Sequence, residues 1–364
     1  MARVIVRILH LEPGPTAGPL ERLLADARHA VGERHVAGFR AAGADDVRLV
    51  SGPPDDTPFG ARLRALLAEA GPGPAPMGLV ILGAGSLPLA GLADRRALVE
   101  AAAGPTRSAL ANNRYSADAV AIARADELPD VPDLPGDNAL PRWLEEVAGW
   151  SVADLRRRWR LQVDLDSPLD VELARPGAVP SGVGDILRDR LVAVRRVATD
   201  RRAELVVAGR TSATTLRWLE RSTACRVRAL IEERGLRASA RLALADASGA
   251  PRRSPGRPPR SVLGALLDRD GPAALGARLA ELGDAAVMDT RVLLAHRLGA
   301  DETAWPSPED RFASDLLLPD RVHDPWLQAL TLAAAEAPIP ILLGGHTLVG
   351  PGLRLALRPR RAIA

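Results

Sequence analysis

The chain has 364 residues, of which 47% are hydrophobic and 26% are charged, and its formal net charge is +3. This length and composition predict a soluble globular protein with a large core, built more readily as two domains than as one. No apolar run reaches the roughly 18 to 20 residues that span a bilayer. Because Arg7 also interrupts the N-terminal apolar run, we expect a cytoplasmic protein with no signal peptide and no membrane partner.

Two residue types narrow the chemistry further. The single Cys225 excludes an intrachain disulfide and a cysteine-based zinc site. All 48 basic residues are arginine, which excludes Schiff-base and P-loop lysine chemistry. Aromatic residues make up only 3% of the chain, too few for base-stacking platforms. The sequence therefore predicts no nucleic-acid partner.

The first half alternates strand and helix patterns. A first strand is expected at residues 3–9, a helix with apolar residues at spacings of three and four at 20–42, and a second strand at 45–52. The remaining expected elements are a helix at 55–71, a strand at 79–82, a helix at 93–103, strands at 106–113 and 118–128, a helix at 138–149, and a strand followed by a helix start in 160–175. This alternation predicts a mostly parallel, doubly wound α/β sheet.

The most distinctive strand is the apolar run Leu79–Leu82, which lies between Gly78 and Gly83. A short apolar run bounded by turn residues is typical of a buried strand in a parallel sheet. Ligands of open α/β sheets bind beyond the carboxyl ends of the strands. We therefore expect the turn from Gly83 to Ser86 to lie at a ligand-binding edge.

The second half is also predicted to be α/β, with weaker alternation, after a boundary near 176–184. The expected domains are therefore 1–175 and a smaller second α/β domain at 183–364, with an exposed linker at 247–260. The expected elements are a helix at 183–199, a strand at 203–209, a helix at 211–221, a helix or strand at 225–234, an edge strand at 237–246, helices at 261–269 and 272–283, a strand and helix in 284–299, an irregular segment at 305–320, a helix at 324–337 and a final strand in 339–345.

Three stretches of the first half carry a family resemblance: residues 79–89 (LVILGAGSLPL), 118–128 (DAVAIARADEL) and 139–174, which ends in DLDSPLDVELA. Together they resemble a nucleotidyltransferase domain of the GT-A type. The chain is similar to the group that contains the molybdopterin cytidylyl- and guanylyltransferases and the phospholactate guanylyltransferase. The resemblance implies a nucleotide-diphospho-sugar transferase-like fold for this half. It also implies Mg²⁺-dependent transfer of a nucleotidyl group to a phosphorylated small molecule.

The resemblance also implies a site. Asp164 and Asp166 would be the catalytic, Mg²⁺-holding carboxylates. The nucleotide would be bound by Gly83, Gly85, Ser86, Arg22, Asn112 and Asn113. The sequence departs from the family in two places, because no glycine-rich loop follows the first strand and Ser86 stands where the family has a metal-binding Asp.

Purely structural roles for some of these residues stay open as alternatives. Asp166 begins Asp-Ser-Pro, which is also a good helix start, and Asn112-Asn113 is also a common turn former. The expected partner is a nucleotide or a phosphorylated small molecule, and a homodimer is compatible with the sequence. An alternative function is a non-catalytic module that binds a nucleotide or another metabolite.

A further alternative is a phosphoester-directed enzyme with its site in the second half. Three strand-like runs there end in polar residues, and parallel neighbours would bring their carboxyl ends to one crevice. A helix start with Thr, Ser and Arg suits a phosphate or carboxylate, and Asp289 and His296 are possible partners of His346. The candidates in this half are Arg210, Thr211, Ser212, Asp289, Arg291, Asp310, Arg311 and His346.

Overall fold

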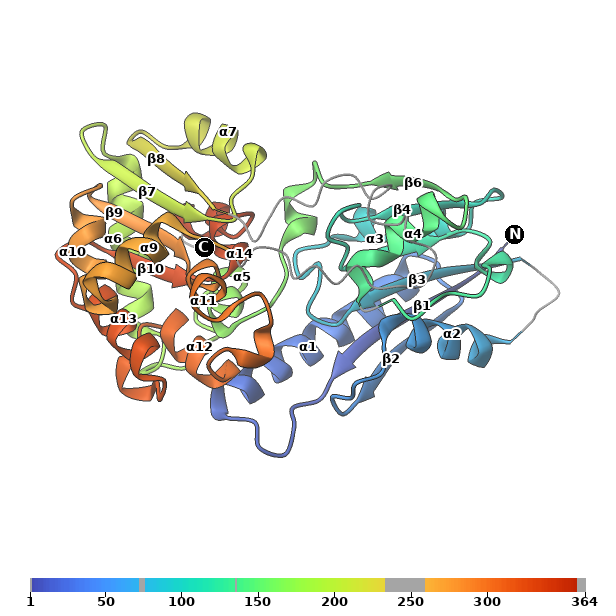
Figure 1. Cartoon of the computed structure of the whole chain (residues 1–364). Helices are drawn as coiled ribbons and strands as arrows, with labels where there is room; N and C mark the ends of the chain where they lie inside the picture. Colours follow the sequence, from blue (N-terminus) through green and yellow to red (C-terminus); the bar gives the residue numbers. More distant parts are fainter. Residues whose placement is uncertain (1, 72–75, 135, 233–258, 359–364) are drawn as a thin grey trace. The chain divides into compact units, whose positions relative to one another are not determined.

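The computed structural model describes residues 2–71, 76–134, 136–232 and 259–358 (Figure 1). The chain divides into two compact units, and each is α/β. The N-terminal unit holds the described residues of 2–17 and 25–165. The C-terminal unit holds 18–24 and the described residues from 166 onwards.

The N-terminal unit is built on a six-stranded, mostly parallel sheet with the order β2-β1-β3-β5-β4-β6. Only β5 runs against its neighbours, because it pairs antiparallel with both β3 and β4. The parallel α/β sheet that the alternation predicts is therefore confirmed at this level. The strands are β1 (Arg3–Leu11), β2 (Asp46–Gly52), β3 (Met77–Gly83), β4 (Ser108–Ala111), β5 (Ala119–Ile122) and β6 (Ser151–Asp154).

Two apolar layers cover this sheet because the side chains of β1 and β3 alternate between its faces. One layer packs Ile5 of β1 against Leu63 of the second helix, and the other packs Ile8 against Phe39 of the first helix. The buried run Leu79–Leu82 lies in β3, as predicted. The helices are α1 (Pro19–Ala41, whose first residues belong to the C-terminal unit), α2 (Phe59–Ala70), α3 (Leu92–Ala102) and α4 (Leu140–Glu146).

One strand prediction in this unit is wrong. Residues 159–162 form a short 3₁₀ helix, and the only pairing of the following segment is an isolated bridge between Ser86 and Asp164. Leu161, Val163 and Leu165 alternate with polar residues because their side chains are buried. The segment achieves this burial without pairing in a β-sheet. The pattern missed β6, since this edge strand is half exposed and carries only a short apolar signal.

The C-terminal unit contains a four-stranded parallel sheet with the order β10-β9-β7-β8. The three polar-ended strands that the sequence left open as parallel neighbours are β7, β9 and β10, and the sheet places β9 between the other two. The strands are β7 (Glu204–Gly209), β8 (Arg226–Ile231), β9 (Ala285–Asp289) and β10 (Ile341–Gly344). The helices are α5 (Pro168–Ala174), α6 (Asp185–Thr199), α7 (Ala213–Ser222), α9 (Val262–Asp270), α10 (Leu275–Ala280), α11 (Thr290–Leu298), α12 (Pro308–Asp315), α13 (Pro325–Ala335), α14 (His346–Val349) and α15 (Leu353–Leu357).

The prediction of an irregular segment at 305–320 is wrong, because these residues contain the helix α12. The Ser307 side chain accepts a hydrogen bond from the Asp310 N–H, and Pro308 occupies the first turn, both of which are ordinary helix-start features. The predicted edge strand at 237–246 and residues 247–258 of the predicted linker lie outside the described residues. Within the described parts of the chain, no helix is both long and apolar enough to cross a membrane.

Candidate functional site

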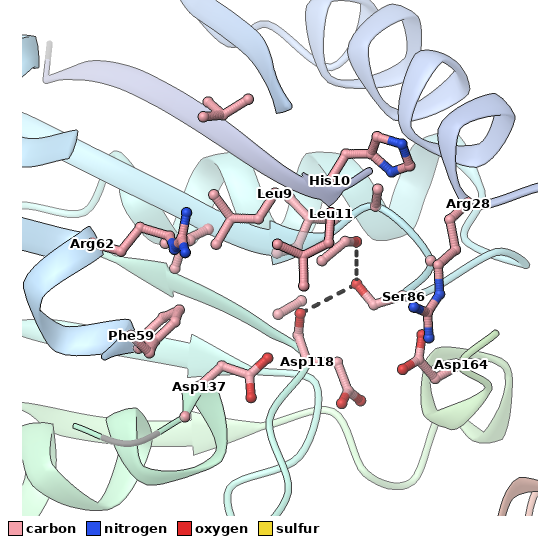
Figure 2. Close-up of a pocket in the computed structure, with 18 of the residues that line it drawn as sticks. Leu9, His10, Leu11, Arg28, Phe59, Arg62, Ser86, Asp118, Asp137 and Asp164 are labelled. Atoms are coloured by element: carbon pink, nitrogen blue, oxygen red, sulfur yellow. Dashed lines mark hydrogen bonds between the residues drawn. The ribbon is translucent and has the colours of Figure 1, made fainter. Parts of the chain in front are cut away.

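The N-terminal unit contains a cavity of about 350 Å³ at the carboxyl ends of β1 and β3 (Figure 2). Strand β1 contributes Leu9 to Leu11, and the turn after β3 contributes Gly83 to Ser86. The two strands end side by side because Leu9 is in register with Gly83. The turn predicted to lie at a ligand-binding edge therefore borders a real cavity.

The cavity has an apolar side and a polar side. Leu9, Leu11, Val50 and Phe59 line the apolar side, and all but the exposed Leu11 pack against the core layer of α2. Alternation along β1 turns His10 to the opposite face of the sheet. The polar side is lined by His10, Arg28, Ser86, Asp118 and Asp164.

The turn after β3 is tied to its neighbours through its backbone. Ser86 Oγ donates to the Gly83 carbonyl at 2.7 Å and to the Asp118 carbonyl at 3.2 Å, shown as dashed lines in Figure 2. A side chain at Gly85 would displace Arg28, since a Cβ there would lie 2.8 Å from Arg28 Cγ. Leu87 is buried at a φ of 50°, in the left-handed region that branched-chain residues rarely adopt.

Two carboxylates lie on the polar side. Asp118 precedes β5, and its Oδ2 accepts a hydrogen bond from Asn112 Nδ2 at 2.9 Å. Asp164 forms the isolated bridge with Ser86, and the guanidinium of Arg28 and the carboxylate of Asp164 point toward one another in Figure 2. Arg28 Nε also donates to the Leu165 carbonyl at 2.7 Å. Hydrogen bonds thus fix both carboxylate-bearing segments.

His10 adds a neutral ring to the polar side. Burial, followed by the charge of His29, lowers the pKa of His10. The ring meets that of His29 edge to face at 5.1 Å between centroids. His10 Nδ1 is buried with no hydrogen-bond partner. The imidazole therefore adds hydrogen-bonding capacity near neutral pH but little charge.

The cavity lining is acidic overall. It carries the carboxylates of Asp55, Asp118, Asp137 and Asp164, whereas its guanidiniums are those of Arg28 and Arg62. One of these charges is locally balanced, because Arg62 pairs with Asp55 at 2.6 Å. In the part of the chain that the structure describes, no three His, Cys, Asp or Glu side chains are grouped closely enough to hold a metal ion by themselves.

The structure brings together four of the nucleotide-site residues suggested by the sequence: Gly83, Gly85, Ser86 and Asp164 line the cavity. Asn112 does not line it. Asn112 is 1% exposed, and its amide is used inside the β4–β5 hairpin, where it donates to Asp118 and to the Leu161 carbonyl and accepts from the Asp118 and Ala119 N–H groups.

The other predicted residues serve elsewhere. Asn113 caps a local turn by accepting from the Tyr115 N–H at 3.0 Å, which is the turn-forming role left open for it. Arg22 and Asp166 belong to the C-terminal unit. In that unit Asp166 Oδ2 lies 3.8 Å from His346 Nδ1.

The C-terminal unit places polar side chains at the carboxyl ends of its strands. Arg210, after β7, binds Asp289, at the end of β9, through Nε at 2.5 Å and Nη2 at 3.1 Å. Gly209 permits this approach, since a Cβ there would lie 2.4 Å from Asp289 Cβ. Ser212 caps α7 by accepting from the Thr215 N–H, and Thr211 Oγ1 is buried without a partner.

Other candidates in this unit have structural roles. Asp310 is on α12 rather than on a loop, and its carboxylate accepts from the N–H groups of His323 and Asp324. Burial opposes its ionisation, but the hydrogen bonds from His323 and Asp324 hold the pKa of Asp310 below its usual value. Arg311, also on α12, pairs with Glu302 and stacks over the Trp305 ring.

Neither of the partners suggested for His346 is its partner here. His296 accepts a hydrogen bond from the Ser261 N–H at 2.9 Å and is bound to Asp268 at 2.9 Å. Asp289 is held by Arg210 and by the Arg291 N–H. The guanidinium of Arg291 instead binds the buried Asp315 through two contacts of 2.5 and 2.6 Å.

Sequence reasoning missed His10, His35, Asp118 and Asp137 in the N-terminal unit. His10 directly follows the strand predicted at 3–9 and Asp118 begins the strand predicted at 118–128, so their positions at strand ends are the available signal. His35 continues the buried series Val31 to Phe39 at a spacing of four residues, and a polar residue on such an apolar helix face is a usable signal.

No known family model and no curated protein matches this chain. The function of the cavity is therefore inferred from its residues and geometry.

Proposed function

We propose that the N-terminal unit is a GT-A-like nucleotidyltransferase domain that binds a nucleotide with Mg²⁺ in this cavity and transfers its nucleotidyl group to a phosphorylated small molecule. The observation that carries the proposal is the cavity at the carboxyl ends of β1 and β3, lined by the turn Gly83–Ser86 and by Asp164. This is the edge at which open α/β sheets bind ligands.

The two sides of the cavity fit the two ends of a nucleotide. The apolar side of Leu9, Leu11, Val50 and Phe59 offers a surface for a flat base, since small-molecule sites bury ring systems against apolar and aromatic side chains. The polar side offers Arg28 to a phosphate oxygen, because guanidinium groups bind phosphates with strong, directed hydrogen bonds.

The carboxylates fit Mg²⁺ rather than a fully protein-ligated metal. Asp118 and Asp164 supply hard oxygen donors, and Mg²⁺ is commonly held by one or two carboxylates together with substrate phosphates. Asp118 lies next to Ser86, where the resembled family has its metal-binding Asp. In this proposal Asp118 and Asp164 hold the metal. When bound, Mg²⁺ would neutralise phosphate charge.

The proposed reaction needs positioning more than covalent chemistry. A phosphate oxygen of the acceptor forms a bond to the α-phosphorus of the nucleotide, and the bond from that phosphorus to the β-phosphate bridging oxygen breaks to release pyrophosphate. Such transfers depend on in-line alignment and on charge stabilisation. Arg28 would orient the phosphates, and the hydrogen-bonded turn Gly83–Ser86 would fix the floor of the site.

Ligand-dependent thermal unfolding of the full chain tests this proposal. We expect GTP or CTP to raise the melting temperature only when Mg²⁺ is present, because the acidic lining repels free triphosphate. Asp118→Asn and Asp164→Asn should each weaken Mg²⁺-dependent binding at least tenfold, measured by titration calorimetry, because each removes a charged metal ligand. Asp133→Asn, at an exposed carboxylate outside the cavity, is the matched control and should bind as the wild type does.

Two outcomes would count against transfer. Binding of nucleotide that is equally strong without Mg²⁺ and unaffected by either substitution would move the ligand away from these carboxylates. Binding with no release of pyrophosphate in the presence of phosphorylated hydroxy acids or molybdopterin-like acceptors would favour the non-catalytic binding module.

A further inference from the structure

The buried His35 lies directly behind the floor of the cavity. It is on α1, is 1% exposed, and is not one of the residues that line the cavity. Its Nε2 lies 2.8 Å from the Ser86 carbonyl oxygen, and its Nδ1 lies 3.2 Å from Arg95 Nη2. Arg95, on α3, also donates to the Ala90 carbonyl at 3.0 Å.

These contacts determine which nitrogen of His35 carries the proton. The pKa of His35 is lowered to about 4, mainly by burial and also by the charges of Arg95 and Arg34, while the hydrogen bond to Ser86 opposes this shift. The ring is therefore neutral at pH 7 and carries one N–H. Since an arginine can only donate, Nδ1 is the acceptor for Arg95, and Nε2–H donates to the Ser86 carbonyl.

The backbone that His35 holds is strained. Leu87, joined to Ser86 by the peptide whose carbonyl His35 binds, has a φ of 50°. A branched side chain in that conformation raises the energy of the backbone, and such residues persist only where surrounding contacts fix them. The turn is also held by backbone hydrogen bonds from Ala84 N to the Leu9 carbonyl, from Gly83 N to the Asp118 carbonyl and from Leu165 N to the Gly85 carbonyl, at 2.7, 3.2 and 3.2 Å. Among the side-chain hydrogen bonds to this turn, that of His35 reaches the carbonyl directly before Leu87.

Helix α1 carries two glycines that make this arrangement possible. A Cβ at Gly38 would lie 2.6 Å from Arg95 Nε, and a Cβ at Gly32 would lie 2.8 Å from Leu49 and 3.3 Å from Ala84 of the turn. Interior helical glycine is unfavourable compared with alanine. At these positions it lets the helix approach both Arg95 and the turn closely.

We propose that His35 is a positioning residue of this site, which holds the turn Gly83–Leu87 in its strained, ligand-ready form by donating a hydrogen bond to the Ser86 carbonyl under the orientation of Arg95. The ligand in this inference is the nucleotide of the proposed function, on which the inference rests. The contacts of His35 themselves do not depend on that function. The inference assigns a role in shaping the cavity floor to His35 of α1 and Arg95 of α3, neither of which lines the cavity.

The test compares two replacements of the same ring in the full chain. His35→Gln keeps an N–H donor near the position of Nε2, whereas His35→Leu keeps the bulk and removes the donor. With Mg²⁺–GTP and Mg²⁺–CTP as probes, we expect His35→Leu to weaken binding about tenfold and His35→Gln to stay within about threefold of the wild type. Arg95→Met should weaken binding in the same direction, because it frees the ring to turn.

Val36→Ala is the control for general destabilisation. Val36 is the next residue of α1, is buried in the core layer and does not contact Ser86 through a side-chain hydrogen bond. It should lower the melting temperature while leaving the affinity unchanged at temperatures well below the transition. Equal affinities for His35→Leu and wild type, or an equal loss in Val36→Ala, would overturn the proposal.

A second measurement needs no ligand and separates this inference from the proposed function. Hydrogen exchange followed by mass spectrometry should show the amides of 83–87 exchanging about tenfold faster in His35→Leu than in the wild type or in His35→Gln. If neither probe binds the wild type, the proposed function fails but this readout still decides the inference. Unchanged exchange in His35→Leu would refute it.

Discussion

Replacing Asp315 with alanine is expected to destabilise the C-terminal unit by about 3–5 kcal/mol, the loss typical of a broken buried ion pair. Asp315 is fully buried and binds the guanidinium of Arg291, whose side chain is 11% exposed, through two short contacts. The substitution leaves that guanidinium buried without its carboxylate. Denaturant unfolding, with hydrogen exchange to assign the loss to this unit, measures the effect.

Two further variants are needed to interpret the loss of stability in Asp315→Ala. The double variant Arg291→Met with Asp315→Leu should be more stable than Asp315→Ala alone, because no uncompensated charge remains buried. Glu281→Ala removes an exposed carboxylate that pairs with Arg278 in the same unit, and it should leave the transition almost unchanged. A double variant no more stable than the single one would show that the pair itself, rather than its desolvation, dominates.

The stability of the C-terminal unit should fall as the pH rises from about 5 to about 8, because of Asp170. Burial raises the pKa of Asp170 to about 8, and the charges of Asp166 and Asp315 push in the same direction, whereas the hydrogen bond from Ser167 opposes them. An unfolded Asp titrates near 3.9. The folded unit therefore binds a proton that the unfolded chain releases, and each pH unit in this window costs up to about 1.4 kcal/mol.

Asp170→Asn isolates that contribution. The amide can keep the contacts that Oδ2 accepts from Ser167 and from the Asp166 N–H, and it has no proton to lose. The free energy of unfolding of Asp170→Asn relative to wild type should thus increase steadily from pH 5 to pH 8. His10 and His35, whose pKa values are lowered, contribute equally to the pH dependence of stability in the wild type and in Asp170→Asn. Their contributions therefore cancel in the difference between the two free energies of unfolding. A difference that stays constant with pH would contradict the raised pKa.

The sequence predicted the parts of the fold that depend on local patterns. Apolar runs located β3, β7 and β9, whereas the adjacency of β7, β9 and β10 was only a condition of the second candidate site and is visible in the sheet alone. Short or half-exposed elements were missed: β6 has only four residues. The helix α12 was missed because a Ser-Pro start was interpreted as a loop.

The cavity residues that the sequence predicted are those directly after β3, together with Asp164, which the family resemblance suggested. Gly83, Gly85 and Ser86 were found because they follow β3. Asp137 and Arg62 line the same cavity but come from segments far from β3 along the chain. Their position beside the turn after β3 therefore cannot be inferred from the sequence. Asn112 was wrongly predicted as a ligand contact, because its side-chain oxygen accepts hydrogen bonds from backbone N–H groups of the β4–β5 hairpin. These N–H groups come near Asn112 only when both strands are folded. His35 acts through the backbone, so no motif of side chains marks it.

The reversed direction of β5 has a consequence for how this site could change. The β4–β5 connection is a hairpin whose far end, 113–117, opens next to Asp118 at the edge of the cavity. A parallel strand at this place would need a crossover helix, which ties any change of length to the packing of a whole layer. A hairpin loop can lengthen at a cost of only about 0.6 kcal/mol per doubling. Natural or designed insertions at 113–117 would therefore reshape the rim of the cavity while the parallel strands keep their register.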